Sequence, residues 1–222
     1  MAEYARFTWT VVMPVKVLGQ AKSRLAVLAG QRRPALALAL ASDTVAAVTR
    51  CPEVARVLVV TSDPLATETL SRLGAGVEPD RPARGLNDAL AHGAAVAARR
   101  WPGEGIAALT ADLPALRPSE LAEALRAASG AVSSSGAVSS FVADAAHVGT
   151  TMYATVPGGE FVPRFGGESR ARHALAGARE IALDGIPGLR RDVDTPEDLR
   201  AAVALGTGPR TTALAGELLA LS

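Results

Sequence analysis

A chain of 222 residues that is 49% hydrophobic, 20% charged and carries a net charge of +1 can bury a sizeable core, and it does not suit nucleic-acid binding through a broad basic face. No apolar stretch reaches the roughly 18 residues that a membrane span needs, and the single cysteine, Cys51, excludes an internal disulfide framework. We therefore expect a soluble cytoplasmic protein that forms one domain over residues 1–222, with no nucleic-acid or membrane partner.

The first half of the chain alternates short apolar runs with helical patterns, which is typical of an α/β protein. The apolar runs predict strands over residues 8–14, 55–60 and 76–78, and the helical patterns predict helices over residues 34–50, 64–73 and 86–100. Asp63 marks the start of the second helix, and Asn87 or Asp88 is the expected cap of the third.

The segment after the first strand is a basic loop that carries Lys16, Lys22 and Arg24 around Gly19. A loop of this kind at the end of a strand in an α/β sheet suits phosphate groups. It lacks the glycine spacing of a P-loop or of a dinucleotide fingerprint. It is therefore either a phosphate cradle of another kind or a solvated basic turn.

The run over residues 105–109 predicts a strand that is buried on both faces, and Asp112 follows it directly. Open α/β sheets bind ligands at the carboxyl edge of their strands, so Asp112 stands where a ligand or a metal would be held. The alternative is that Asp112 caps a turn.

Further along the chain, a helix is expected from Arg117 to about residue 128. A flexible connection rich in serine and glycine over residues 129–140 should lead into strands over residues 138–143 and 149–155. A glycine turn over residues 164–169 precedes a helix to residue 175, and a last helix spans residues 211–221. The backbone amides of the glycine turn suit an anion, although an ordinary loop is the alternative.

A second acidic site contains Asp192 and Asp194, which lie on one face of an extended chain because they are two residues apart. Their mutual repulsion would be relieved by a divalent cation, or by Arg190 and Arg191. Further along, Asp198 belongs to a capping box with Thr195, which gives it a structural role.

Three aspartates that follow predicted strands, together with one basic loop, indicate phosphoryl or nucleotidyl transfer. Carboxylates hold Mg²⁺, which bridges phosphate oxygens, and the basic loop neutralises the charge that develops during transfer. The scattered histidines and Cys51 form no nucleophile motif. Transfer onto a phosphate needs no general base, because a phosphate monoester with a second pKa of about 6 is already ionised at pH 7.

The motifs Pro14-Val15-Lys16, Ala111-Asp112-Leu113-Pro114, Arg164-Phe165-Gly166 and Asp192-Val193-Asp194 together resemble the 2-phospho-L-lactate or phosphoenolpyruvate guanylyltransferase family, from about residue 8 to residue 205. Members of that family act in the biosynthesis of the deazaflavin coenzyme F-420. The resemblance implies a three-layer α/β/α, Rossmann-like fold of the nucleotide-diphospho-sugar transferase type, with a mixed, mostly parallel sheet. It also implies condensation of GTP with a phosphorylated three-carbon acid, foremost phosphoenolpyruvate, and release of pyrophosphate.

The resemblance assigns a role to each candidate residue of this sequence. It implies two Mg²⁺ ions held by Asp112, Asp192 and Asp194. The nucleotide phosphates would contact Lys16, Lys22 and Arg24, and the guanine base would face Asn87. The acid would be held by Thr151, Gly166 and Ser169, although the local sequence leaves Thr150 as the alternative to Thr151.

The sequence leaves the acceptor, the class of protein and the oligomeric state open. The acceptor is phosphoenolpyruvate, 2-phospho-L-lactate or 3-phosphoglycerate, which differ by only a few atoms. The alternative functions are those of a nucleotidyltransferase that acts on a sugar or a molybdopterin, a non-catalytic nucleotide-binding module, and a structural α/β protein. A homodimer is also open.

Overall fold

The computed structural model describes residues 7–81, 83–135 and 138–220. The strands of these ranges form one sheet of seven strands. They are β1 (Trp9–Pro14), β2 (Val54–Val60), β3 (Gly76–Glu78), β4 (Gly105–Leu109), β5 (Ser139–Ala143), β6 (Thr150–Thr155) and β7 (Arg179–Glu180).

Helices surround this sheet and connect its strands. The α-helices are α1 (Ala26–Ala29), α2 (Arg33–Val48), α3 (Pro64–Ser71), α4 (Leu86–Arg100), α5 (Pro118–Ser135), α6 (Ser169–Leu175), α7 (Pro187–Arg190), α8 (Pro196–Leu205) and α9 (Pro209–Leu219). Three 3-10 helices, η1 (Leu18–Gln20), η2 (Ser23–Leu25) and η3 (Gly30–Arg32), lie between β1 and α2.

The sheet is mixed and mostly parallel, with the strand order β3-β2-β1-β4-β6-β5-β7. Of the seven described strands, β6 alone runs antiparallel to its neighbours. The amino end of β6 therefore meets the carboxyl ends of β1, β4 and β5 at one edge of the sheet. The chain order reverses between β1 and β4, which is the switch point where open α/β sheets bind ligands.

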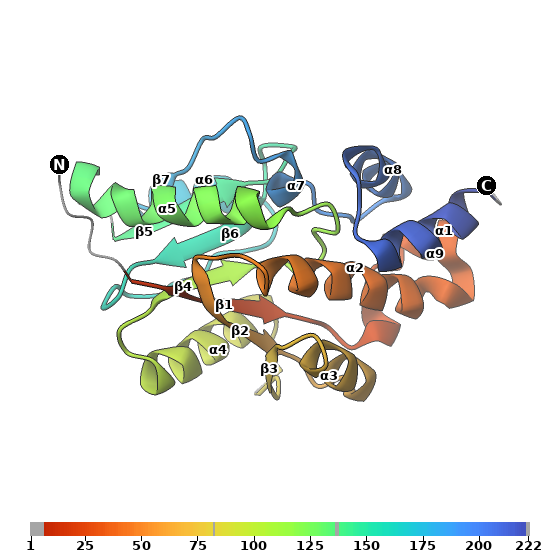
Figure 1. Cartoon of the computed structure of the whole chain (residues 1–222), viewed down its shortest axis with the longest axis horizontal. Helices are drawn as coiled ribbons and strands as arrows, with labels where there is room; N and C mark the ends of the chain where they lie inside the picture. Colours follow the sequence, from red (N-terminus) through yellow and green to blue (C-terminus); the bar gives the residue numbers. More distant parts are fainter. Residues whose placement is uncertain (1–6, 82, 136–137, 221–222) are drawn as a thin grey trace.

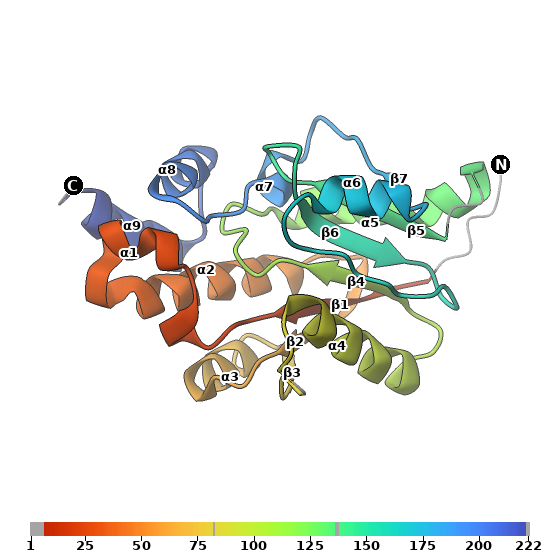
Figure 2. The same ribbon diagram turned by 180° about the vertical axis from the view of Figure 1, so that it is seen from behind.

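Helices cover both faces of the sheet, giving three layers. Figure 1 shows α2 and α5 in front of the strands, and the view from behind in Figure 2 shows α4 and α6 on the other face. Alternate residues of β1 explain this arrangement: Val11 and Met13 pack in the cluster on the α2 and α5 face, while Val12 packs in the cluster with α4. The expected α/β/α fold is confirmed.

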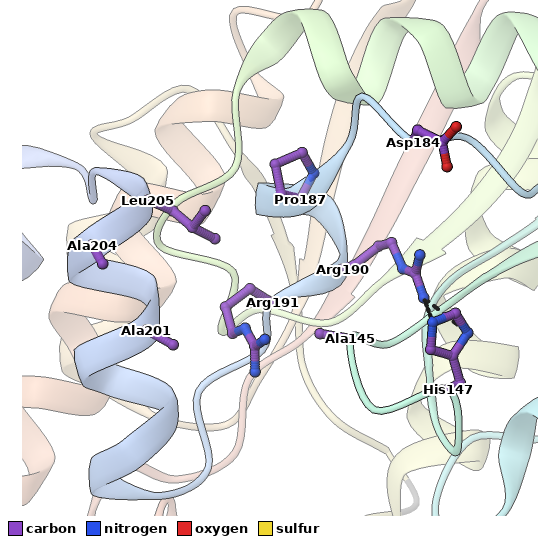
Figure 3. Close-up of a pocket in the computed structure, with 9 residues that line it drawn as sticks. All are labelled: Ala145, His147, Asp184, Pro187, Arg190, Arg191, Ala201, Ala204 and Leu205. Carbon is purple, nitrogen blue, oxygen red and sulfur yellow. Dashed lines mark hydrogen bonds between the residues drawn. The ribbon is translucent and has the colours of Figure 1, made fainter.

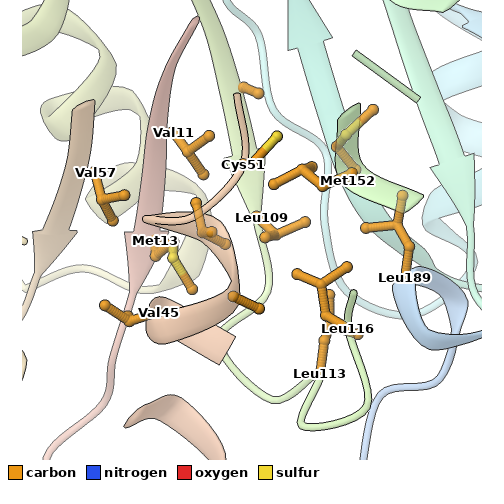
Figure 4. Packing of buried hydrophobic residues seen from close by; sticks show 14 of the residues in the cluster. Val11, Met13, Val45, Cys51, Val57, Leu109, Leu113, Leu116, Met152 and Leu189 are labelled. Carbon is orange, nitrogen blue, oxygen red and sulfur yellow. The ribbon is translucent and has the colours of Figure 1, made fainter. Parts of the chain in front are cut away.

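The largest core cluster is aliphatic, as the low aromatic content of the sequence requires. Figure 4 shows Val11, Met13 and Leu109 of the sheet packed near Val45 of α2 and the buried Cys51. At about 25 cal/mol per Å² of buried apolar surface, burial of this kind supplies most of the stabilising free energy.

A separate cluster attaches α8 and α9 to the amino-terminal half of α2, where Leu36 and Leu40 contact residues such as Leu199 and Ala215. Val193 is fully buried in the same cluster. The C-terminal helices therefore hold the second acidic segment against the edge of the sheet.

Two sequence expectations were wrong. Helix α5 continues to Ser135 rather than ending near residue 128, because a helix that is already formed extends at little cost through serines, which are only mildly unfavourable in helix interiors. Within it, Ser129 Oγ donates to the carbonyl oxygen of Leu125 at 3.1 Å. Residues 136–137 of the expected flexible connection lie outside the described residues. The N-cap of α4 is Gly85, which has a φ of 123°, and not Asn87 or Asp88.

The expected starts of two other helices are confirmed. Asp63 caps α3 by accepting hydrogen bonds from the N–H groups of Leu65 and Ala66, and Thr195 forms the capping box of α8 with Asp198. In the described ranges, none of the helices combines the length and the apolar character that crossing a membrane requires.

Candidate active site

A cleft of about 750 Å³ lies at the edge of the sheet where β1, β4 and β5 end and β6 begins. The residues that line it come from the loop after β1, the turn after β4, the connection between β5 and β6, the turn before α6 and the second acidic segment, and also from α2, the end of β2 and the segment that leads into α4. Of the ten candidate residues from the sequence, eight line this cleft: Lys16, Lys22, Arg24, Asp112, Gly166, Ser169, Asp192 and Asp194. Asn87 and Thr151 are not among its lining residues.

The basic loop is held in a fixed shape by two residues that follow it in the chain. The backbone N–H of Leu18 donates to Asp63 Oδ2 at 2.9 Å. The guanidinium of Arg33 donates to the carbonyl oxygen of Ala21, and to that of Gly19 at 2.7 Å. The loop is therefore an anchored part of the cleft rather than a freely solvated turn.

Lys22 joins the basic loop to both acidic segments. Its ammonium contacts the carboxylate of Asp112 and lies 2.8 Å from Asp194 Oδ1. Burial disfavours the ammonium form, but the two carboxylates outweigh this effect and raise the pKa of Lys22. The backbone of Lys22 has a φ of 56°, a left-handed conformation that a residue with a side chain adopts at some cost and that recurs at functional sites.

The two acidic segments are fastened to each other through the backbone. The N–H of Val193 donates to the carbonyl oxygen of Asp112 at 3.1 Å. Because Asp192 and Asp194 flank Val193, this hydrogen bond places both of them beside Asp112. Asp112 is therefore part of the cleft, and within the described residues its side chain caps no helix or turn.

Burial, together with the nearby carboxylates of Asp112, Asp194 and Asp144, raises the pKa of Asp192 to about 7. Lys22 opposes this rise, and it lowers the pKa of Asp194 despite the burial of that group. A site that holds several carboxylates against their own repulsion is suited to a cation.

Asp144 is a fourth carboxylate at the cleft, which the sequence reasoning missed. Its carboxylate accepts hydrogen bonds from the N–H groups of Val148 at 2.9 Å and Gly149 at 2.7 Å. A Cβ atom at Gly149 would lie 2.4 Å from Asp144 Oδ2, so glycine is needed there. Asp144 comes directly after β5, and Asp112 comes three residues after the end of β4, so an acid just beyond a strand is the signal that could have found it.

The arginines that precede Asp192 do not pair with the second acidic segment. Arg190 donates to the carbonyl oxygens of Ala143 and Asp144 and to the ring of His147. Figure 3 shows Arg190 directed toward His147 at a separate pocket of about 400 Å³. Arg191 lies 3.5 Å from Asp198. The alternative that these arginines relieve the repulsion is wrong, because Lys22 takes that place.

The donor atoms at the cleft fit a hard divalent cation, although the carboxylates are not gathered around one point. Among the residues that the structure describes, no three acidic, histidine or cysteine side chains are grouped closely enough to hold a metal ion. The ammonium of Lys22 lies between two of the acids instead. Asp112 Oδ1 is buried and has no hydrogen-bond partner in the described part of the chain, which leaves one carboxylate oxygen available to a ligand such as Mg²⁺.

The two candidate threonines at the start of β6 differ in what their hydroxyl groups contact. Thr150 lines the cleft, and its Oγ1 lies 3.0 Å from Nδ1 of His173. Thr151 is fully buried, and its Oγ1 has no hydrogen-bond partner among the described residues. The hydroxyl of Thr151 is therefore the free one, whereas that of Thr150 is already engaged.

The glycine turn before α6 faces the cleft through Phe165, Gly166, Gly167 and Ser169. Gly166 and Gly167 have φ values of 93° and 48°, which favour glycine. In the part of the chain that the structure describes, the N–H groups of Gly166 and Gly167 have no hydrogen-bond partner. Free backbone amides at a cleft suit an anion.

Structural comparison shows that nucleotidyltransferases share this fold. A protein from Desulfovibrio desulfuricans G20 that is assigned to the nucleotide-diphospho-sugar transferases aligns with a TM-score of 0.69 and 15% identity, over 96% of both chains. A nucleotidyl transferase from Methanothermobacter thermautotroptrophicus aligns with a TM-score of 0.61 and 18% identity, over 89% of this chain and 97% of the other. A protein from Mycobacterium tuberculosis H37Rv, solved as a complex with manganese, aligns with a TM-score of 0.52 and 17% identity, over 89% of this chain and 98% of the other.

Sequence comparison identifies the family. The phosphoenolpyruvate guanylyltransferase of Thermomonospora curvata is 61% identical over 218 residues, which cover 98% of this chain and 93% of the relative. The phosphoenolpyruvate guanylyltransferase of Streptosporangium roseum is 57% identical over 206 residues, which cover 93% of this chain and 90% of the relative. A scan against models of protein families found no match. The chain belongs to the phosphoenolpyruvate guanylyltransferase family.

Proposed function

We propose that this protein condenses GTP with phosphoenolpyruvate, forms enolpyruvoyl-2-diphospho-5'-guanosine and releases pyrophosphate, as a step in the biosynthesis of coenzyme F-420. The names of its relatives support the reaction and the acceptor. The observation that carries the proposal for this chain is the meeting of Lys22 with Asp112 and Asp194, which joins a phosphate-binding loop to carboxylates at the switch point of the sheet.

In this proposal the basic loop binds the triphosphate of GTP. Lys16, Lys22 and Arg24 line the same end of the cleft, and Lys16 and Arg24 are close enough to Asp194 to lower its pKa. Their positive charges offset the charge that accumulates on the triphosphate during transfer. Because Asn87 does not line the cleft, the proposal includes no contact between Asn87 and the guanine base.

The acceptor is held by the glycine turn before α6. The free amides of Gly166 and Gly167 bind its carboxylate, and the hydroxyl group of Ser169, which also lines the cleft, adds a further donor. This placement leaves the phosphate of the acid directed toward the triphosphate and the aspartates.

The transfer itself is an exchange of one bond to phosphorus. A non-bridging oxygen of the acceptor phosphate forms a bond to the α-phosphorus of GTP, while the bond from that phosphorus to the α–β bridging oxygen breaks. Pyrophosphate leaves with the bridging oxygen. No general base is needed, since the acceptor phosphate is already ionised near pH 7.

We assign divalent metal binding to Asp112, Asp192 and Asp194, with two Mg²⁺ ions as the expected number. Bound there, Mg²⁺ would supply positive charge that offsets the negative charge of the phosphate groups. The manganese complex of a structural relative is consistent with this assignment. A single catalytic domain over residues 1–222 and a location in the cytoplasm are part of the same proposal.

The experiment that tests the proposal measures pyrophosphate release from GTP and Mg²⁺ with phosphoenolpyruvate, 2-phospho-L-lactate or 3-phosphoglycerate in separate reactions. Phosphoenolpyruvate should give the highest kcat/KM and a product with the mass of its guanylyl adduct. Preference for another acid would keep the reaction class and change the acceptor. No pyrophosphate with any acid would overturn the proposed function.

A further inference from the structure

We propose that Asn87 and His173 are positioning residues that fix the acceptor turn, residues 164–169, in the shape that binds the three-carbon acid. This goes beyond the proposed function and rests on it only for the identity of the acid. Neither side chain is expected to touch a substrate. Each instead holds the backbone that precedes Gly166.

Asn87 pairs with both backbone groups of one residue of the acceptor turn. Its Oδ1 accepts a hydrogen bond from the N–H of Phe165 at 2.8 Å, and its Nδ2 donates to the carbonyl oxygen of Phe165 at 3.1 Å. Asn87 and Phe165 are 78 residues apart in the chain. The amide side chain of α4 is therefore committed to the turn, which explains why it neither caps its helix nor faces the cleft.

His173 holds the preceding residue of the turn from α6. Its Nε2 accepts a hydrogen bond from the N–H of Arg164 at 2.9 Å, so the proton of the neutral ring lies on Nδ1, 3.0 Å from Thr150 Oγ1. Burial, together with the charges of the neighbouring Arg172 and Arg164, lowers the pKa of His173 to about 4. The ring is thus neutral at pH 7 and able to accept this hydrogen bond.

Aromatic packing completes the attachment. The ring of His173 stacks on Tyr153, with 4.7 Å between their centroids, and meets the ring of Phe165 at 79°. Phe165 is 4% exposed. Three backbone groups of the two residues immediately before Gly166 are therefore fixed: the N–H of Arg164 and both the N–H and the carbonyl oxygen of Phe165.

The two side chains should therefore affect the binding of the acid and leave the binding of the nucleotide unchanged. If the turn loosens, the free amides of Gly166 and Gly167 lose their alignment, while the basic loop keeps its own anchors at Asp63 and Arg33. A different outcome is expected if Asn87 contacts the guanine base, because loss of that contact would weaken the binding of GTP instead.

The test uses variants that remove the hydrogen bonds and keep the surrounding packing. Asn87→Ala removes both bonds to Phe165, and Asn87→Asp keeps the acceptor for its N–H but loses the donor. His173→Phe keeps an aromatic ring in the stack and loses both ring nitrogens. The matched control is Asp88→Ala, an exposed neighbour on the same turn of α4.

Asn87→Ala and His173→Phe should each raise the KM for phosphoenolpyruvate about tenfold, as expected for the loss of two hydrogen bonds. The KM for GTP should stay within about twofold, Asn87→Asp should fall between Asn87→Ala and the wild type, and Asp88→Ala should behave as wild type. A rise confined to GTP, or equal losses for both substrates, would overturn the positioning role.

Hydrogen–deuterium exchange tests the same inference without turnover. The amides of Arg164 and Phe165 should be protected in the wild type and should exchange faster in His173→Phe and Asn87→Ala, respectively. Unchanged protection in both variants would contradict the proposal. If the wild type makes no pyrophosphate yet these amides lose protection in the variants, the proposed function fails while the structural basis of the positioning role stands.

Discussion

Lys22 Nζ lies 2.8 Å from Asp194 Oδ1, although the two residues are 172 positions apart in the chain. The same ammonium contacts Asp112 at the end of β4. One cation therefore connects the basic loop with both acidic segments, and it holds a place between carboxylates that a divalent metal would also favour.

Replacing Lys22 tests whether the basic loop binds the triphosphate. Lys22→Ala should weaken GTP binding about 10–100-fold, because a hydrogen bond from a charged donor contributes about 1.5–3 kcal/mol. Binding of the three-carbon acid should change far less. Titration calorimetry with each ligand measures both affinities, and Arg32→Ala, which removes an exposed arginine, is the matched control. Normal GTP binding by Lys22→Ala would show that the loop is only a basic turn.

The crowded carboxylates predict a pH-dependent cost to stability. Burial raises the pKa of Asp192 from 3.8 to about 7, so the folded protein binds this proton more tightly than the unfolded chain does. The resulting stabilisation is complete below about pH 4 and is lost as the pH rises through about 7. Asp192→Asn does not titrate and escapes this loss.

Metal-free Asp192→Asn should therefore unfold at a higher temperature than the wild type at pH 8, by roughly 2–4 °C for each kcal/mol gained. The difference should shrink at pH 5. Thermal unfolding in the presence of a chelator at both pH values measures it. A variant that is less stable at pH 8, or a difference independent of pH, would show that Asp192 is not strained by its neighbours.

The adjacent threonines of β6 predict different effects of the same substitution. Thr151→Val should leave the KM for the acid near that of the wild type, since Thr151 does not line the cleft, and should not lower stability, because its buried hydroxyl has no partner to lose. Thr150→Val should cost about 1 kcal/mol of stability through the lost contact with His173. Initial rates and thermal unfolding of the two variants form a matched comparison. A rise in the KM for the acid in Thr150→Val alone would indicate that Thr150 is the threonine that contacts the acid.

Gly166 tests where the acid binds. Gly166→Ala places a side chain on a residue with a φ of 93°, which costs about 1 kcal/mol and disturbs the approach of the backbone to a ligand. The KM for the acid should rise while GTP affinity stays near that of the wild type. Gly158→Ala is the control, since Gly158 has a φ of 78° and no atom within 4 Å of an added Cβ, and it does not line the cleft. Equal effects of the two substitutions would place the acceptor elsewhere.

Local patterns predicted much of the fold and the charged half of the site. Asp112 was found because it follows an apolar strand, and Asp63 and Thr195 because caps have a local signature. The extent of α5 was missed, since serine and glycine on their own favour loops, whereas a helix that is already formed can extend through them.

The missing parts of the site depend on contacts between distant segments. No local pattern pairs Lys22 with Asp194, or Asn87 with Phe165, because the sheet order brings these residues together. His173 gave no signal as an isolated histidine, and its role follows from the burial and partners that the fold provides.

The central claim is that the phosphate of phosphoenolpyruvate attacks the α-phosphorus of GTP, and isotope labelling tests it most directly. Phosphoenolpyruvate labelled with ¹⁸O at its three non-bridging phosphate oxygens is incubated with GTP, Mg²⁺ and the enzyme, and both products are analysed by mass spectrometry. The account predicts all three labels in the guanylyl adduct, one of them in the new diphosphate bridge, and none in the pyrophosphate. Label in the pyrophosphate, or an unlabelled guanylyl product, would contradict it.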